Sequence, residues 1–186
     1  MEKEAYTVMS KVFAHRGFSG QYPENTLLAF RKAIESGCHG IELDVHLSKD
    51  GIPVVIHDER IDRTTDGTGE IRNYTAEELR RFDAGAIMPG RFAFEPIPTL
   101  EEYFTLVKDS SIVTNIELKN GVFRYEGMEE KVIQMIHKYH LRIGSSFPPS
   151  IMNPSHCAVS SFRKFPAASF MIAGCFIPEH TPKPMA

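Results

Sequence analysis

The sequence predicts an α/β fold in which a parallel β-sheet is covered by helices. Short apolar segments alternate with segments whose apolar residues recur at helical spacing, between about residues 12 and 143. This alternation is typical of parallel sheets, because each connecting helix crosses and covers the sheet. Reactive polar residues also lie at or near the carboxyl ends of four apolar strands of consistent polarity, which is where parallel α/β folds form their sites.

The composition is that of an ordinary soluble protein. The chain has 186 residues, enough for a single domain with its own core, and 42% of them are hydrophobic. Its net charge of −3 argues against a general nucleic-acid binder. No apolar run approaches the roughly 20 residues of a membrane span, and the first residues lack the apolar stretch of a signal peptide. We therefore expect a cytoplasmic protein without stable membrane insertion, and its three cysteines suit a reducing compartment.

The first predicted strand covers residues 12–14 and leads directly into His15. Asn25 or Thr26 is expected to cap the following helix, in which apolar residues recur at three- and four-residue spacing. Gly37 is expected to end this helix, because glycine readily takes the left-handed conformation that follows many helices.

The second predicted strand, residues 41–45, alternates apolar and acidic side chains. Its three apolar residues face one side, whereas Glu42 and Asp44 face the other, about 7 Å apart along the strand. Two carboxylates on one face are costly unless something neutralises them, and a divalent cation with oxygen ligands would do so. An edge strand with one solvated face would show the same alternation and would need no cation.

A third predicted strand, residues 53–56, follows a tight turn at residues 49–51 and ends at His57 and Asp58. The pattern then becomes irregular to about residue 98, which is too long for an ordinary connecting loop. We interpret this stretch as an insertion or as a functional segment.

Capping boxes predict two helix starts in the second half of the chain, at Thr75 and at Thr99. A fourth strand is expected over residues 112–119, and a last helix is expected over residues 128–139. These elements continue the alternation of strands with helices.

Three acidic side chains lie on the predicted strands. Glu42 and Asp44 belong to the second strand, and Glu117 belongs to the fourth, where it shares a face with Lys119. Carboxylate oxygens are hard ligands that suit Mg²⁺ or Ca²⁺, whereas Zn²⁺ prefers nitrogen and sulfur. We therefore interpret the three carboxylates as candidate metal ligands. We interpret His46 as a surface or structural residue, with a role in the site as the alternative because it continues the face of the second strand.

Two histidines and two cations complete a candidate site for phosphate chemistry. His15 and His57 can act as general acid and base near neutral pH. Arg16 and Lys119 can hold an anionic group. A metal, an acid–base pair and two cations together indicate hydrolysis at a phosphate, in which charge is stabilised and a leaving alkoxide is protonated. Taken alone, His57 could instead belong to an exposed turn, and Lys119 to a solvated loop.

Five short motifs follow one another along residues 11–147. They are His15-Arg16-Gly17, Pro23-Glu24-Asn25-Thr26, Ile41-Glu42-Leu43-Asp44-Val45, His57-Asp58 and Ile116-Glu117-Leu118-Lys119. In order, spacing and residue types they resemble the motifs of the glycerophosphodiester phosphodiesterase family. The resemblance implies a (β/α)8 barrel in which residues 58–98 form the small insertion of the family.

The resemblance also implies a function. That function is hydrolysis of small-molecule glycerophosphodiesters to glycerol 3-phosphate and an alcohol, with one divalent cation, Ca²⁺ or Mg²⁺. Carried over residue by residue, the resemblance assigns the metal to three carboxylates, the acid–base steps to two histidines and the phosphate to two cations: Glu42, Asp44 and Glu117; His15 and His57; Arg16 and Lys119.

The chain departs from the family at its carboxyl end. A (β/α)8 barrel typically needs about 250 residues, and the chain has 186. Residues 144–186 hold 7 of the 12 prolines and only four charged residues. Ser145-Ser146-Phe147 resembles the sixth strand of the family, after which the pattern fails.

We therefore expect one barrel domain over residues 1–186 that is incomplete or aberrant at its C-terminal end, with residues 148–186 as an atypical tail. A parallel barrel that lacks units has exposed strand edges, which favour oligomerisation. The alternative to an active enzyme is a truncated, catalytically inactive member of the same fold that still binds metal or phosphate.

Overall fold

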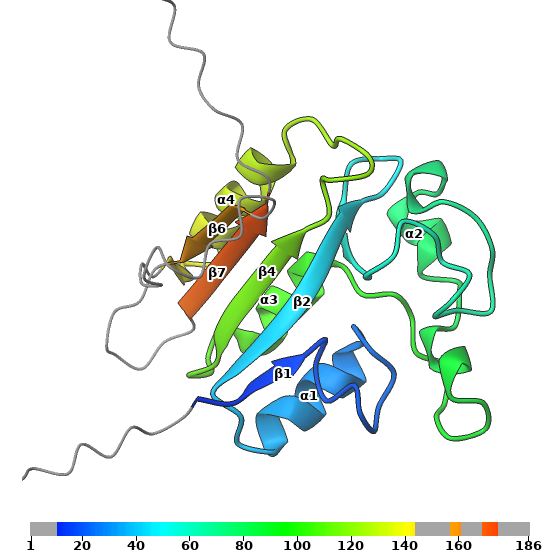
Figure 1. Cartoon of the computed structure of the whole chain (residues 1–186), viewed down its shortest axis with the longest axis horizontal. Helices are drawn as coiled ribbons and strands as arrows, with labels where there is room; N and C mark the ends of the chain where they lie inside the picture. The colour runs from blue at the N-terminus through cyan, green and yellow to red at the C-terminus, as the bar shows by residue number, and fades with distance from the viewer. Residues whose placement is uncertain (1–10, 144–156, 161–168, 175–186) are drawn as a thin grey trace, which may run out of the picture.

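The structure is a computed structural model that describes residues 11–143, 157–160 and 169–174. Strands and helices alternate through the first of these ranges, as predicted, and the described strands form one seven-stranded sheet (Figure 1). The strands are β1 (Phe13–His15), β2 (Gly40–Leu47), β3 (Pro53–Val55), β4 (Val113–Leu118), β5 (Arg142–Ile143), β6 (Cys157–Ser160) and β7 (Ser169–Gly174). Their order along the sheet is β1-β2-β4-β7-β5, with β3 paired to β2 and β6 paired to β7.

The helices begin where the sequence predicts their caps. They include α1 (Leu27–Glu35), α2 (Ala76–Leu79), α3 (Leu100–Val107) and α4 (Met128–Lys138). Of the two candidate caps of α1, Thr26 is the residue whose side chain accepts a hydrogen bond from the backbone N–H of Ala29. Both predicted capping boxes form, at Thr75 and at Thr99. Gly37 follows α1 with a φ of +74°, which confirms its predicted role.

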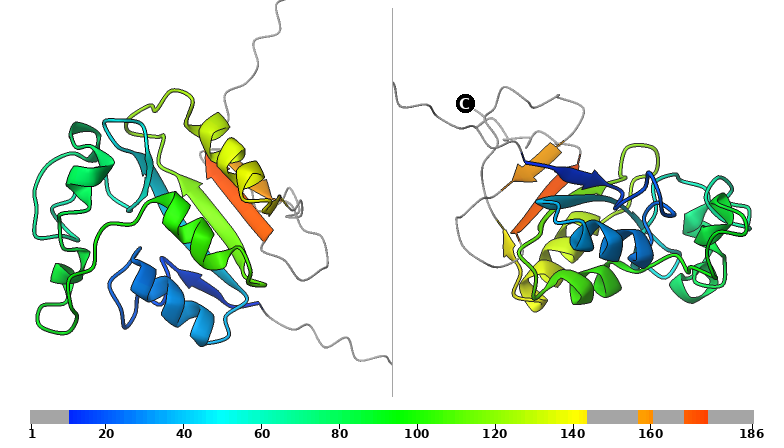
Figure 2. Two further views of the ribbon diagram at one scale, coloured as in Figure 1. Left: turned by 180° about the vertical axis from the view of Figure 1, so that it is seen from behind. Right: turned by 90° about the horizontal axis from the view of Figure 1, so that it is seen from below.

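Helices α1, α3 and α4 cover one face of the sheet (Figure 2). The apolar side chains of β2 and β4 that face these helices are buried: Ile41, Leu43, Val45, Ile116 and Leu118. Phe30 of α1 and Tyr103 of α3 are both 0% exposed, and their rings meet edge-on with centroids 4.8 Å apart. Because side chains alternate along a strand, this packing turns Glu42 and Asp44 toward the opposite face of the sheet.

Parallel pairing places the candidate ligands in adjacent strands. β2 pairs in parallel with β1 and with β4. The register puts His15 opposite Glu42 and puts Asp44 opposite Glu117. Adjacent strands lie about 4.8 Å apart, so the carboxylates of β2 and β4 are neighbours in the sheet.

The third strand runs against the direction that the sequence analysis assumed. β3 pairs antiparallel with β2, so the prediction of consistent polarity is wrong for this strand. A parallel crossover needs a dozen or more residues, whereas only the tight turn at residues 49–51, with Gly51 at a φ of +73°, joins the two strands. As a result the chain returns along β2. The backbone N–H of Ile56 donates to the carbonyl of Asp44 at 3.1 Å, which brings His57 back toward the acidic stretch.

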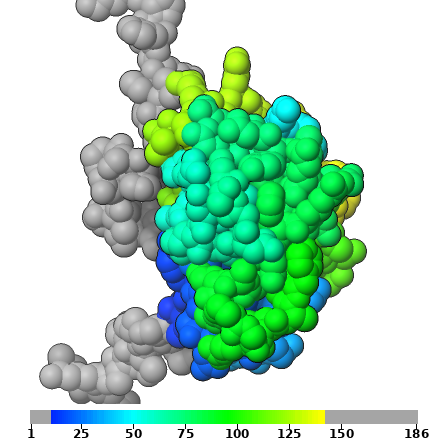
Figure 3. Space-filling model, turned by 90° about the vertical axis from the view of Figure 1, so that its right-hand side faces the viewer, coloured from blue at the N-terminus to red at the C-terminus, as the bar shows by residue number. Residues whose placement is uncertain are grey.

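The segment between β3 and α3 packs around apolar side chains of its own. It contains η1 (Ile71–Asn73), α2 and η2 (Ala84–Ile87). Its buried residues form a second cluster together with two residues at the end of β3: Val54, Ile56, Ile61, Ile71, Ala76, Leu79, Ala84 and Ile97. Figure 3 shows the side of the molecule that this segment covers. We refer to residues 58–98 as the insertion below.

The described part of the tail adds strands to the sheet. β7 runs parallel between β4 and β5, and β6 pairs antiparallel with β7. A (β/α)8 barrel places successive strands side by side, so β7 interrupts the expected order. The described sheet is thus an open part of a barrel, with β1 and β5 at its ends. Ser145-Ser146-Phe147 lies outside the described residues. Among the described helices, none combines the length and the hydropathy that a membrane span needs.

Replacing Phe30 with alanine is expected to lower the free energy of unfolding by about 3–5 kcal/mol, because it leaves a cavity where α1 and α3 meet. Urea unfolding monitored by circular dichroism measures this loss. The matched control is Phe94→Ala, whose side chain is 54% exposed, and its expected effect lies within about 0.5 kcal/mol. Equal losses in the two variants would contradict the packing described here.

Candidate active site

Three carboxylates gather on the face of the sheet opposite the helices. One oxygen each of Glu42, Asp44 and Glu117 lies within 4.8 Å of the other two. Alternation along β2 puts the first two on one face, and the parallel pairing of β2 with β4 brings in the third. Asp44 is 0% exposed. The structure therefore brings the three predicted metal ligands together.

Two basic side chains neutralise part of this charge. Lys119 Nζ lies 2.9 Å from Asp44 Oδ1 and 2.6 Å from Glu117 Oε1. Burial alone would lower the pKa of Lys119, but these two carboxylates raise it above its usual value. Arg16 Nε lies 3.3 Å from Asp44 Oδ2, and the backbone N–H of Arg16 donates to Glu42 Oε2 at 3.0 Å. Both predicted phosphate-binding cations thus lie within the acidic cluster.

The loop between β1 and α1 has an unusual backbone conformation. Arg16 and Asn25 have φ values of +55° and +57°, and the backbone N–H of Asn25 donates to the carbonyl of Arg16 at 3.0 Å. Positive φ is uncommon outside glycine and is concentrated at functional sites. The side chain of Asn25 donates from Nδ2 to Asp44 Oδ2 at 2.9 Å. Sequence reasoning considered Asn25 only as a helix cap, because nothing in the local pattern indicates that contact.

The charges of this cluster fit a divalent cation. The three carboxylates and the two basic side chains leave one negative charge in excess. Burial, and next the charge of Asp44, raise the pKa of Glu42 to about 7, which indicates that these carboxylates are held together with too little positive charge. A divalent cation would turn the excess into one positive charge, which matches the single negative charge of a phosphodiester. Three hard oxygen donors are a ligand set that Ca²⁺ and Mg²⁺ accept.

The strands that lead to His15 and His57 run toward each other along one edge of β2. β4 occupies the other edge over the same stretch, so β1 and β3 share the remaining edge. β1 runs along it to His15, which pairs with Glu42, and β3 runs the other way toward Asp44. His15 Nε2 lies 3.9 Å from Glu42 Oε2, and the His15 side chain is 67% exposed. Although β3 runs antiparallel to β2, the hairpin still brings His57 back beside the middle of β2, from the direction opposite to that of His15.

The ring of His57 is held by the neighbouring Asp58. His57 Nδ1 lies 2.5 Å from Asp58 Oδ1, and the two side chains are 31% and 29% exposed. An ionised carboxylate can only accept a hydrogen bond, so Nδ1 carries the proton and Nε2 is left able to accept one. Burial alone would raise the pKa of Asp58, but hydrogen bonds from Arg63 and His57 lower it to about 2. The pair is part-buried and fixed, unlike the exposed turn that the dipeptide alone suggests.

His46 contacts the backbone of His57 and is not part of the carboxylate cluster. It is fully buried, with Nε2 3.0 Å from the carbonyl oxygen of His57 and Nδ1 3.2 Å from the hydroxyl of Tyr125. A carbonyl can only accept, so Nε2 carries the proton and Nδ1 accepts from the tyrosine. Burial lowers the pKa of His46, which favours this neutral form. The contacts of His46 are thus structural, which agrees with the main sequence-based interpretation, and they hold the backbone of His57.

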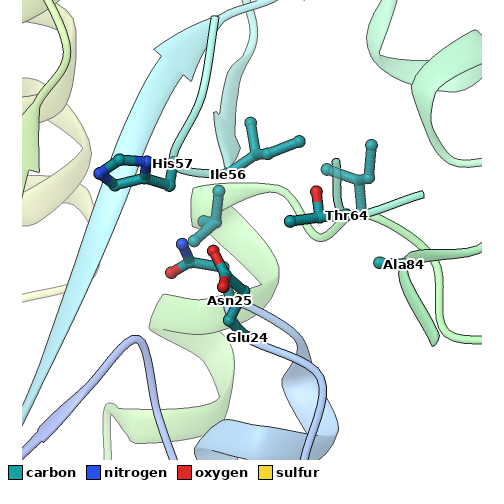
Figure 4. Close-up of a pocket in the computed structure, with 8 residues that line it drawn as sticks. Glu24, Asn25, Ile56, His57, Thr64 and Ala84 are labelled. Carbon is teal, nitrogen blue, oxygen red and sulfur yellow. The ribbon is translucent and has the colours of Figure 1, made fainter. Parts of the chain in front are cut away.

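A pocket opens beside His57 (Figure 4). Glu24 and Asn25, at the start of α1, line it together with Thr64 and Ala84 of the insertion. Segments that are far apart in the sequence therefore meet at one point next to the histidine.

A comparison with protein-family models shows which family the chain belongs to. Residues 15–164 match the model of the glycerophosphoryl diester phosphodiesterase family. The chain belongs to this family. Solved structures of the family are (β/α)8 barrels, so the predicted fold class is confirmed, with the described sheet as an open part of that barrel.

Similar proteins carry the same family name. A glycerophosphodiester phosphodiesterase of Caldanaerobacter subterraneus subsp. tengcongensis is 43% identical over 172 residues, which cover 80% of this chain and 71% of that protein. One of Bacillus altitudinis is 52% identical over 134 residues, which cover 72% of this chain and 55% of that protein. A phosphodiesterase of Oleispira antarctica, solved in complex with the product sn-glycerol-3-phosphate, is 37% identical with a TM-score of 0.61, over 74% of this chain and 57% of that one. The chain thus spans 55–71% of the length of these proteins.

Excess Ca²⁺ or Mg²⁺ is expected to raise the Tm of the protein. A ligand that binds only the folded state stabilises it by about 2.7 kcal/mol at a hundredfold excess over Kd. Thermal unfolding with the cation and with a chelator measures the shift. Glu117→Gln should lose most of it, whereas Glu77→Gln, at a side chain that is 83% exposed, should retain it. A full shift in Glu117→Gln would show that the cation binds elsewhere.

Asp58 is expected to contribute stability that depends on pH. Its folded pKa of about 2 lies below the ordinary value of 3.8, so this contribution is present above about pH 4 and is lost as the pH falls toward 2. Asp58→Asn should therefore cost about 1 kcal/mol at pH 7, after allowance for the part-exposed side chain, and much less at pH 2.5. Urea unfolding at the two pH values measures both. A loss that is equal at both, or matched by Asn at the exposed Asp109, would contradict the assignment.

Proposed function

We propose that this chain hydrolyses glycerophosphodiesters to glycerol 3-phosphate and an alcohol. The observation that carries the proposal is that three carboxylates and two cations meet on one face of β2 and β4, with His15 beside Glu42. His57 directly follows Ile56, whose backbone N–H donates to the carbonyl of Asp44. Membership of the family and the product in the Oleispira antarctica complex support this substrate class. The partner of the site is therefore a small molecule.

In this proposal the carboxylates of Glu42, Asp44 and Glu117 hold one divalent cation, Ca²⁺ or Mg²⁺. When bound, the cation stabilises the negative charge that develops on the phosphate oxygens. Asp44 is the ligand most restricted in position, because Arg16, Asn25 and Lys119 all contact it. The remaining steps belong to side chains of the chain itself.

Arg16 and Lys119 would bind the phosphate. Both lie against Asp44, so the substrate would share them with that carboxylate rather than recruit them from solvent. Their side chains are only 18% and 14% exposed, which limits the freedom that binding must remove. The planar guanidinium of Arg16 can contact two oxygens at once, and Lys119 acts as a point charge.

His15 and His57 would transfer the protons. One histidine takes the proton of the glycerol 2-hydroxyl as its oxygen attacks the phosphorus, and the other donates a proton to the oxygen of the leaving alcohol. Water then opens the cyclic phosphate to give glycerol 3-phosphate. Asp58 fixes the tautomer of His57 that presents Nε2 as a proton acceptor. His15 is the more exposed of the two, at 67% against 31%, and lies at the rim of the cluster.

The test is release of glycerol 3-phosphate from glycerophosphocholine by the full chain with Ca²⁺ or Mg²⁺. His15→Ala and His57→Ala are each expected to lower kcat by a factor on the order of 10²–10⁴, because each removes a proton-transfer group. His137→Ala, at an exposed histidine of α4, is the matched control and should keep the wild-type rate.

Release that survives His15→Ala would overturn the assignment of that residue. A folded wild-type chain that binds the cation, as judged by its Tm, and releases no product would overturn the activity. That result would favour the inactive member of the fold that binds metal or phosphate.

A further inference from the structure

Arg63, in the insertion, lies between two carboxylates that each hold a residue of the candidate active site. Its Nε and Nη2 lie 2.6 and 3.2 Å from the two carboxylate oxygens of Asp58. Its Nη1 and Nη2 lie 2.9 and 2.8 Å from the two oxygens of Glu24. One guanidinium therefore makes a paired contact with each carboxylate, a geometry that lysine cannot reproduce.

Each of these carboxylates holds a second partner. Asp58 accepts from Nδ1 of His57 at 2.5 Å, and Glu24 accepts from Nη1 of Arg16 at 3.1 Å. Burial alone would raise the pKa of Glu24, but Arg63 and Arg16 lower it. The contacts thus run from one histidine of the site through Arg63 to the arginine that lies against the acidic cluster.

The arrangement differs from an ordinary surface ion pair. The Arg63 side chain is 44% exposed, but Glu24 and Asp58 are only 15% and 29% exposed. Exposed ion pairs contribute little to stability, because water weakens the attraction and both side chains lose conformational freedom when they pair. Arg60, three residues earlier, shows that ordinary case: it is 55% exposed and contacts Asp62 at 2.9 Å.

We propose that Arg63 is a positioning residue of this site, which fixes His57 through Asp58 and Arg16 through Glu24. The inference rests on the proposed function, since it concerns how the proposed acid–base and phosphate-binding residues are held. It also gives the insertion a role in the reaction, because residues 58–98 contribute the arginine. Glu24, His57 and Thr64, the neighbour of Arg63, line the same pocket (Figure 4).

Loss of the guanidinium should act on both residues. Without it, Asp58 keeps only His57 and Glu24 keeps only Arg16, and the paired contacts that fix where each carboxylate lies are lost. The acceptor of the His57 ring is then less fixed, which lowers kcat. Glu24, one of the two carboxylate partners of Arg16, is less fixed as well, which raises KM.

Kinetics on glycerophosphocholine test this inference. Arg63→Ala is expected to lower kcat/KM by a factor on the order of ten to a hundred, because small displacements of reacting groups have effects of this size. Arg60→Ala is the matched control and should keep the wild-type value. Adding Arg63→Ala to Asp58→Ala should lower kcat little further, since the arginine acts on His57 through that carboxylate. If the double variant lost kcat by the product of the two single losses, Arg63 would not act on His57 through Asp58.

One further variant and a chemical rescue separate positioning from a general effect on folding. Arg63→Lys keeps the charge and loses the paired contacts, so it should recover only part of the rate. Methylguanidinium at millimolar concentration should restore part of the activity of Arg63→Ala and none to Arg63→Lys, because only the former leaves room for it. Urea unfolding of every variant shows whether the folded state is retained. A folded Arg63→Ala with the wild-type kcat/KM would overturn the proposal.

A spectroscopic readout keeps this test independent of the activity. The ¹⁵N signals of the His57 ring report which nitrogen carries the proton, and the structure predicts the Nδ1–H tautomer in the wild type. Arg63→Ala should shift His57 toward a mixture of tautomers, and Arg60→Ala should leave its signals unchanged. If the wild type releases no product but the tautomer depends on Arg63, the activity fails and the positioning stands. If product is released and neither rate nor tautomer responds to Arg63, the positioning fails alone.

Discussion

The site depends on the burial of one carboxylate, that of Asp44. An ionised group with 0% exposure is costly unless charged and hydrogen-bonding partners surround it. Arg16, Asn25 and Lys119 meet this requirement; the first two belong to the β1–α1 loop, and the third follows β4. A single side chain at the centre of β2 therefore determines where the β1–α1 loop and the end of β4 must lie. The positive φ values of Arg16 and Asn25 follow from the same requirement, since the contacts with Asp44 offset the strain of that loop.

The direction of β3 has a second consequence for the arrangement of the histidines. A site built only from parallel strand ends would deliver every side chain from the same direction. Because β1 and β3 run toward each other along one edge of β2, His15 and His57 approach the carboxylates from two sides. Displacement at a phosphodiester has an attacking and a leaving oxygen on opposite sides of the phosphorus, and the proposed proton-transfer roles of the two histidines suit such a reaction.

Local patterns were sufficient for β1 to β4, for the helices α1 to α4 and for the residues on those strands, but not for β5, β6, η1 and η2. Alternation along β2 revealed Glu42 and Asp44, and the Thr-x-x-Glu pattern revealed the starts of α2 and α3. The tight turn before β3 already indicates an antiparallel strand, because it is too short for a parallel crossover. The general alternation of strands with helices led instead to the prediction of a parallel strand. Contacts such as that between Glu24 and Arg63, 39 residues apart, depend on how the insertion folds back, and no local pattern carries that information.

The two faces of β3 pack against different apolar clusters, and this packing links the insertion to the site. Val55 belongs to the large core beneath the sheet, whereas Val54 and Ile56 belong to the second cluster, around which the insertion packs. Both faces of this strand are therefore packed, and His57, two residues beyond its end, takes its position from both clusters. His46 holds the carbonyl of that same residue from β2, and Arg63 holds its ring through Asp58. Backbone and ring of one histidine are thus fixed by separate parts of the chain, so the insertion must fold for the site to be complete.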